Sequence, residues 1–167
     1  MANKRSIHKE FVMFTYSIIE LPERTIAGIS IETDMRKAMD DCPTLWQKFF
    51  TLFLSQQKES KTDLEVESFG VSRMLDEDRF IYEAAVEVAD GMVTDGLIKS
   101  VLPKTLYLQT TVPNLSKLAD AYQDIYGRWA NEQNEYALNY MEASLEVYPV
   151  NFCEKEYFTL LVPILKK

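Results

Sequence analysis

Short segments of the chain alternate apolar and polar residues, a period of two that is typical of half-buried β-strands. The acidic stretch 76–78 separates two such segments and predicts a hairpin between them. Pro22 and Glu23 mark another turn, between the first two extended segments. Strands are predicted over residues 11–19, 25–31, 64–72, 79–88, 105–112, 143–147 and 157–164.

Two other segments repeat apolar residues at helical spacing. The first, 43–54, begins at Pro43, which is tolerated in the first turn of a helix, and the second, 114–131, begins at Asn114, a good N-cap. The first predicted helix has a broad aromatic face. Its apolar residues are Leu45, Trp46, Phe49, Phe50 and Phe53, and those of the second helix are Leu115, Leu118, Tyr122, Ile125, Tyr126 and Trp129.

The order strand, helix, strand, strand therefore occurs twice. We predict an α+β fold in which two pseudo-symmetric units form one antiparallel sheet, with both helices on one face and the other face partly open. A leader, 1–10, would precede a single domain over 11–167, with repeats at about 11–90 and 103–165. Aligning the halves places Trp46 on Trp129 and Glu67 on Glu146.

The amino-acid composition and net charge limit the classes of function that the chain is expected to have. The 167 residues are 47% hydrophobic and carry a net charge of −8, with no basic cluster longer than Lys4-Arg5. Because nucleic-acid binding depends on clustered Lys and Arg, the chain by itself is not expected to bind nucleic acid. It also has no apolar run of the roughly 18 residues that a membrane span needs, and no signal-peptide pattern. A cytoplasmic protein is expected.

Few residues are available for chemistry. His8 is the only histidine, and the two cysteines, Cys42 and Cys153, lack metal-ligand spacing. Histidine-based triads and His-bearing metal sites are thus hard to assemble. No glycine-rich phosphate loop is present. We predict no metal and no cofactor, and any chemistry must rest on carboxylates, tyrosines and tryptophans.

Several short sequence motifs follow one another along the chain in an order that is characteristic of a known family. They are Phe69-Gly70-Val71-Ser72, Phe80 through Val88, Leu102-Pro103 with Tyr107, Ala121-Tyr122 with Trp129, Leu145-Glu146-Val147-Tyr148, and a closing strand from Phe158 to Ile164. In this order and spacing they resemble the gyrase-inhibitor-like (GyrI-like) or AraC effector-binding family, which includes BmrR-like multidrug-binding domains. The resemblance covers about residues 11–165.

The resemblance implies a groove formed by the two units, lipophilic cationic ligands, and a pocket glutamate at Glu146. Many relatives carry this domain behind a DNA-binding module, for which the residues before the first strand leave no room, so this chain is not expected to act as a transcription factor alone. One stretch departs from the family. Where relatives commonly have a His-x-Gly-like turn, this chain has 110–114, Thr-Thr-Val-Pro-Asn.

Glu146 would share a strand face with Ser144 and Tyr148. The alternative is a solvated surface carboxylate, the usual state of a strand glutamate. Further candidates are aromatic residues that hold cations or donate hydrogen bonds, each of which could equally be a packing residue. They are Tyr82, Tyr107, Tyr148, Trp46 and Trp129, with Glu67 as a second carboxylate by its place in the repeat. Glu83 and Glu87 are expected to face solvent.

The predicted function is non-catalytic binding of a lipophilic, cationic, drug-like molecule, in which Glu146 supplies charge and the tyrosines supply shape. An alternative is a carboxylate-dependent hydrolase that detoxifies cyclopropane-containing electrophiles, with Glu146 and Glu67 as catalytic candidates. A second alternative is a protein-binding gyrase inhibitor, which rests on the family's name alone.

Overall fold

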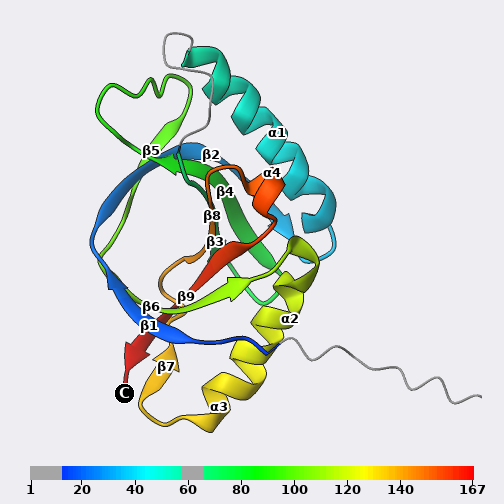
Figure 1. The fold of residues 1–167 in the computed structure, drawn as a ribbon, viewed down its shortest axis with the longest axis vertical. Coiled ribbons are helices and arrows are strands. Elements are labelled where there is room, and N and C mark those ends of the chain that lie inside the picture. Colours follow the sequence, from blue (N-terminus) through cyan, green and yellow to red (C-terminus); the bar gives the residue numbers. More distant parts are fainter. Residues whose placement is uncertain (1–12, 58–65) are drawn as a thin grey trace, which may run out of the picture.

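A computed structural model describes residues 13–57 and 66–167, so the predicted leader and the start of the predicted strand 64–72 lie outside the described residues. The described residues form an α+β fold, as predicted (Figure 1). The strands are β1 (Ser17–Leu21), β2 (Arg24–Asp34), β3 (Ser68–Met74), β4 (Arg79–Glu87), β5 (Ile98–Leu102), β6 (Thr105–Val112), β7 (Tyr136–Leu138), β8 (Ser144–Tyr148) and β9 (Phe158–Lys166).

The helical segments lie between these strands. They are α1 (Ala38–Gln56), η1 (Leu115–Lys117), α2 (Leu118–Gln123), the π-helical η2 (Asp124–Trp129), α3 (Ala130–Glu132) and α4 (Phe152–Lys155). No helix in the described part of the chain is long and apolar enough to cross a membrane.

The strands form one antiparallel sheet in the order β1-β6-β9-β8-β3-β4-β2-β5, with β7 added to the end of β9. Each half of the chain supplies a strand, helix, strand, strand unit, namely β2-α1-β3-β4 and β6-α2-β8-β9. The two units meet where β3 pairs with β8, with Gly70 opposite Glu146. This junction lies in the middle of the sheet.

The sheet is curled, because its connections are too short for a flat one. β1 and β2 are six positions apart in the strand order, or roughly 29 Å at the usual strand spacing. Only Pro22 and Glu23 connect them, a link of about 10 Å at most. Another two-residue link joins β5 to β6. The two ends of the sheet therefore approach each other, as the ring of strands in Figure 1 shows.

Both helical segments pack on one face of the sheet, here called the helix face. Leu45, Phe49 and Phe53 of α1 pack on β4, while Ala121 of α2 and Ile125 of η2 pack on β6 and β9. The prediction that both helices share a face is confirmed. Figure 1 shows α1 and α2 one after the other along the same side of the curved sheet.

The opposite face, here called the inner face, differs from the prediction that it is partly open. It carries an apolar cluster of its own, because the curling brings distant strands together. The buried members of this cluster are Ile26, Phe69, Val71, Ala85, Leu102, Tyr107, Ala143, Leu145 and Leu161.

Helix α1 begins at Ala38, five residues before the predicted start. The Asp34 carboxylate accepts hydrogen bonds from the backbone N–H groups of Arg36 and Lys37, which forms the turn leading into the helix. Pro43 therefore lies inside α1, where its nitrogen cannot donate to the carbonyl of Met39. The helix continues because its aromatic face is buried against the sheet.

Candidate functional site

Glu146 lies in the middle of β8, between Gly70 on β3 and Leu160 on β9. Its side chain points to the helix face, and the residue is only 5% exposed. The alternative of a solvated surface carboxylate is therefore excluded. A buried carboxylate normally requires a compensating cation or hydrogen bonds.

Two tyrosines supply those hydrogen bonds. The Tyr82 hydroxyl donates to Oε2 of Glu146 over 3.2 Å, and the Tyr148 hydroxyl donates to Oε1 over 3.0 Å. The Trp46 indole Nε1 in turn donates to the Tyr82 oxygen over 3.0 Å. Within the described residues, no lysine or arginine forms an ion pair with Glu146. The carboxylate is hydrogen-bonded but has no opposite charge.

Burial raises the pKa of Glu146, and the hydrogen bonds from Tyr148 and Tyr82 only partly oppose that rise. Burial, followed by the nearby charge of Glu146, also raises the pKa of both Tyr82 and Tyr148 well above the usual tyrosine value. The tyrosines therefore stay protonated and act as donors. Burial opposes ionisation of the Glu146 carboxyl, and a positive charge close to it would favour ionisation.

Gly70 leaves the space in which this network forms. A Cβ atom on Gly70 would lie 2.3 Å from the Tyr82 hydroxyl oxygen and 2.7 Å from Oε2 of Glu146. Both distances are too short for any carbon side chain. Glycine at this point of β3 thus lets Tyr82 and Glu146 meet above the sheet.

Aromatic rings from several elements surround the carboxylate. Trp46 on α1 stacks on Phe50, with ring centroids 5.3 Å apart, and meets Tyr148 edge to face at 5.6 Å. Tyr148 also contacts Phe152 of α4 at 4.7 Å. Apolar walls with a buried negative charge at the base suit a hydrophobic cation, because ring faces attract positive charge.

Two tyrosines of the second helical segment, predicted only as part of its apolar face, also approach this site. Tyr122 and Tyr126 stack in parallel with centroids 5.8 Å apart, and the Ser144 side chain hydrogen-bonds both hydroxyl groups. Burial and the charge of Glu146 raise the pKa of Tyr122. Their i, i+4 spacing was visible in the sequence, but it gave no sign that this pair lies beside Glu146.

The other predicted site residues lie elsewhere. Tyr107 pairs with Pro163 on β9, which turns its side chain to the inner face, away from Glu146. Trp129 is half-buried at the far end of the second helical segment, beside Tyr136 of β7. Glu67 is exposed just before β3. The structure thus brings together Glu146, Tyr148, Tyr82 and Trp46, and separates Tyr107, Trp129 and Glu67 from them.

The expectation for Glu83 was wrong. The residue is 4% exposed and its carboxylate lies 3.6 Å from Arg73, because the curled sheet encloses the inner face on which it stands. Burial raises the pKa of Glu83, and the charge of Arg73 opposes the rise. Glu87, on the same face near the end of β4, is exposed as expected.

The described residues contain no group of three or more His, Cys, Asp and Glu side chains able to hold a metal ion. Cys42, on α1, lies near enough to Glu146 to feel its charge. Burial, with that charge and the charge of Asp41, raises the pKa of the Cys42 thiol to about 12. Cys42 is therefore protonated near neutral pH and is a poor nucleophile.

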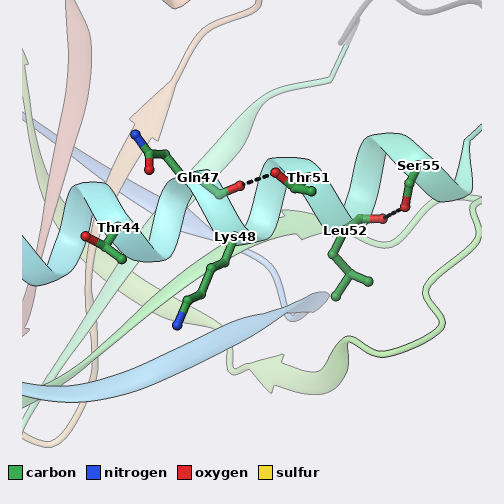
Figure 2. A pocket seen from close by; sticks show the side chains of 6 residues that line it. All are labelled: Thr44, Gln47, Lys48, Thr51, Leu52 and Ser55. Carbon is green, nitrogen blue, oxygen red and sulfur yellow. Dashed lines mark hydrogen bonds between the residues drawn. The ribbon is translucent and has the colours of Figure 1, made fainter.

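Two shallow hollows lie apart from Glu146. One follows the outer side of α1 and is lined by Thr44, Gln47, Lys48, Thr51, Leu52 and Ser55 (Figure 2). In it, the Thr51 hydroxyl and the Ser55 hydroxyl donate to backbone carbonyls of their own helix. The other hollow is lined by Ile18, Trp129 and residues 133–136. Neither brings a buried charge together with aromatic walls, so Glu146 remains the best candidate.

A sequence model of the Cass2 family, described as integron-associated effector binding protein, matches residues 17–164. The chain belongs to this family. The match extends over nearly all described residues, including both halves of the sheet and the junction at Glu146. The predicted membership of the effector-binding, GyrI-like group is confirmed. No curated protein sequence matches the chain.

Solved structures share the fold. An integron cassette protein from the mobile metagenome of Vibrio cholerae is 13% identical, with a TM-score of 0.67 over 91% of this chain and 97% of that one. The protein SAV2435, bound to tetraphenylphosphonium, is 17% identical, with a TM-score of 0.69 over 90% and 94%. A hydrolase from Listeria innocua is 12% identical, with a TM-score of 0.52 over 90% and 91%. At these identities the likeness concerns the fold.

Proposed function

We propose that this protein binds a small lipophilic cation on the helix face, between α1 and α2, with Glu146 as the counter-charge. The observation that carries the proposal is a carboxylate at 5% exposure whose hydrogen-bond partners are neutral tyrosines. Transfer of an ionised carboxylate into an apolar setting is costly without a partner charge. A bound cation provides that charge.

The aromatic residues define what kind of cation fits. Trp46, Phe50, Tyr148 and Phe152 offer flat apolar surfaces from α1, β8 and α4. A small hydrated ion gains little from such walls, whereas an aromatic or alkylated cation buries its surface against them. The similar fold of SAV2435, which was solved with tetraphenylphosphonium, supports the same class of ligand.

The ligand must displace part of this aromatic cluster to reach the carboxylate. Phe152 belongs to the four-residue helix α4, which is flanked by Asn151 at φ 62° and Glu156 at φ 63°. A short helix between two left-handed residues has little intrinsic stability. We infer that α4, with Phe152, moves to admit the ligand while the strands below keep their positions.

The charge preference can be measured by titration calorimetry near pH 8 with tetraphenylphosphonium and with neutral triphenylphosphine oxide. Both ligands carry phenyl rings on phosphorus, so ring stacking affects both. The cation should bind at least about tenfold more tightly, since a charge-assisted contact in an apolar site contributes roughly 1.5–3 kcal/mol. Equal affinities for the two compounds would contradict the proposal.

A second candidate function is acid catalysis by Glu146. The supporting observation is the raised pKa of its carboxyl, the direction of shift that a general acid requires. The Listeria innocua hydrolase has a similar fold. Incubation with a cyclopropane-bearing electrophile, followed by mass spectrometry of ring-opened product, separates the two functions. Turnover that disappears in Glu146→Gln would favour the hydrolase, and absence of turnover in the wild type would favour the binding protein.

A further inference from the structure

The inner face of the sheet carries buried polar atoms that the fold itself does not satisfy. Among the described residues, four buried side-chain nitrogen or oxygen atoms have no hydrogen-bond partner, and three of them stand on this face: Arg24 Nε, Ser100 Oγ and Glu83 Oε1. Glu83 Oε1 has the Arg73 guanidinium at 3.6 Å as an ion-pair partner, whereas Arg24 Nε and Ser100 Oγ have neither a hydrogen bond nor an ion pair. Buried polar atoms in native proteins nearly always have partners, so each unsatisfied one calls for an explanation, such as a water, an ion or another molecule that binds there.

Arg24 and Ser100 are neighbours. Arg24 begins β2 and pairs with Leu102 of β5, and Ser100 stands two residues before Leu102 on the same strand. Residues two apart on a strand point to the same side, so both side chains face inward. The hydroxyl of Ser100 and the guanidinium of Arg24 can therefore act on one ligand group.

The Arg24 guanidinium is not used by the protein in an ion pair. It lies over the Phe69 ring, 5.2 Å from the centroid, and forms no ion pair with a carboxylate of the described residues. Arg73, on the same face, instead has the carboxylate of Glu83 at 3.6 Å. Arg24 is thus the inward arginine whose charge remains available.

Tyr107 stands close to the same group. It is 2% exposed, and burial raises its pKa. The Thr105 hydrogen bond and the charges of Arg24 and Arg73 oppose that rise, and the charge of Glu142 adds to it. Phe69, over whose ring the Arg24 guanidinium lies, belongs to the same buried cluster as Tyr107. Phe69 and Tyr107 therefore provide ring surfaces beside an arginine that has open donors. Arg24 as a whole is only half-buried, so solvent reaches part of it.

We propose that the inner face holds a second binding site, in which Arg24 and Ser100 bind the carboxylate of a small aromatic or aliphatic acid. The planar guanidinium offers paired N–H donors that match a carboxylate, and the Ser100 hydroxyl adds a third. Phe69 and Tyr107 cover the apolar part of the acid. This site lies on the opposite face of the sheet from Glu146 and selects the opposite charge.

Calorimetric titration with benzoate and with neutral benzamide tests this proposal. Wild-type protein should bind benzoate at least about tenfold more tightly than benzamide, the usual scale for a charge-assisted pair. Arg24→Met should remove this preference. Arg36→Met, which removes the same charge at an exposed position, should keep it. An equal affinity of wild type and Arg24→Met for benzoate would overturn the proposal.

Two more variants separate this site from the one on the helix face. Glu146→Gln should leave benzoate binding unchanged, and a loss of benzoate binding in that variant would place the acid on the helix face and overturn the proposal. If circular dichroism shows that Arg24→Met does not fold, Ser100→Ala decides the matter. It should weaken benzoate about threefold or more through the lost hydrogen bond, and unchanged binding would count against the site.

Discussion

Replacing Glu146 by glutamine should weaken binding of tetraphenylphosphonium by about 10- to 100-fold near pH 8, which corresponds to roughly 1.5–3 kcal/mol. Glutamine keeps the shape of the side chain while removing its charge. Its single oxygen can accept from one of the two tyrosines, Tyr148 and Tyr82, and its amide nitrogen then donates to the hydroxyl oxygen of the other. Binding of neutral triphenylphosphine oxide should change little. Parallel calorimetric titrations of both ligands measure the two effects.

The matched control is Glu87→Gln. Glu87 is exposed at the end of β4, on the other face of the sheet, so this variant loses the same formal charge without changing the residues around Glu146. It should bind tetraphenylphosphonium as wild type does. A similar loss in both variants would mean that the overall charge of the protein, and not the buried carboxylate, attracts the cation.

Replacing Gly70 by alanine should push apart the side chains of Tyr82 and Glu146, which meet over this glycine. We expect it to reduce the free energy of unfolding by about 1–3 kcal/mol. The added methyl group would overlap the Tyr82 hydroxyl at 2.3 Å and Glu146 at 2.7 Å, so the network must shift. Replacing a glycine inside a strand by alanine normally stabilises the protein. A loss of stability in Gly70→Ala would therefore come from the steric overlap with Tyr82 and Glu146. Urea denaturation measures it, and affinity for tetraphenylphosphonium should fall about tenfold or more in parallel.

Gly127→Ala provides the comparison. Gly127 lies in η2, and a Cβ atom there would have no heavy atom within 4 Å. Alanine favours helical conformation over glycine, so this variant should be neutral or up to about 1 kcal/mol more stable. If both alanine variants behaved alike, the close approach of Tyr82 and Glu146 over Gly70 would have no energetic importance.

Strands with one buried and one exposed face were predictable from the alternation of apolar and polar residues. Strands without a clear alternation were not. β6 begins and ends where the alternation predicts, at Thr105 and Val112. β5 was missed because its residues Ile98 and Val101 are exposed, so the segment has no clear apolar face. β7 was missed because three residues carry too little pattern. β5 is an edge strand and β7 pairs only with the end of β9. Their hydrogen bonds depend on the folded position of the partner strand, and no local sequence pattern shows that position.

The cluster of residues around Glu146 was predictable in its centre but not at its edges. The alternation in β8 placed Glu146 and Tyr148 on one face, and the family resemblance drew attention to Glu146. The side that Tyr107 faces depends on its pairing with Pro163, a contact across 56 positions that no local pattern reveals. The burial of Glu83 depends likewise on the curl of the whole sheet. Long-range pairing, therefore, decided which candidates meet.

The most direct test of the central claim is the proton released when a cation binds. Glu146 has a raised pKa in the free protein, and a bound cation favours the ionised form and lowers that pKa. Affinity should therefore increase with pH between the bound and free pKa values, with loss of a proton to solvent. Calorimetry in two buffers of different ionisation enthalpy, about one pH unit above the ordinary glutamate value of about 4.3, measures this release. Wild-type protein should release a proton fraction that Glu146→Gln does not, and identical proton exchange in both proteins would contradict the assignment of Glu146 as the counter-charge.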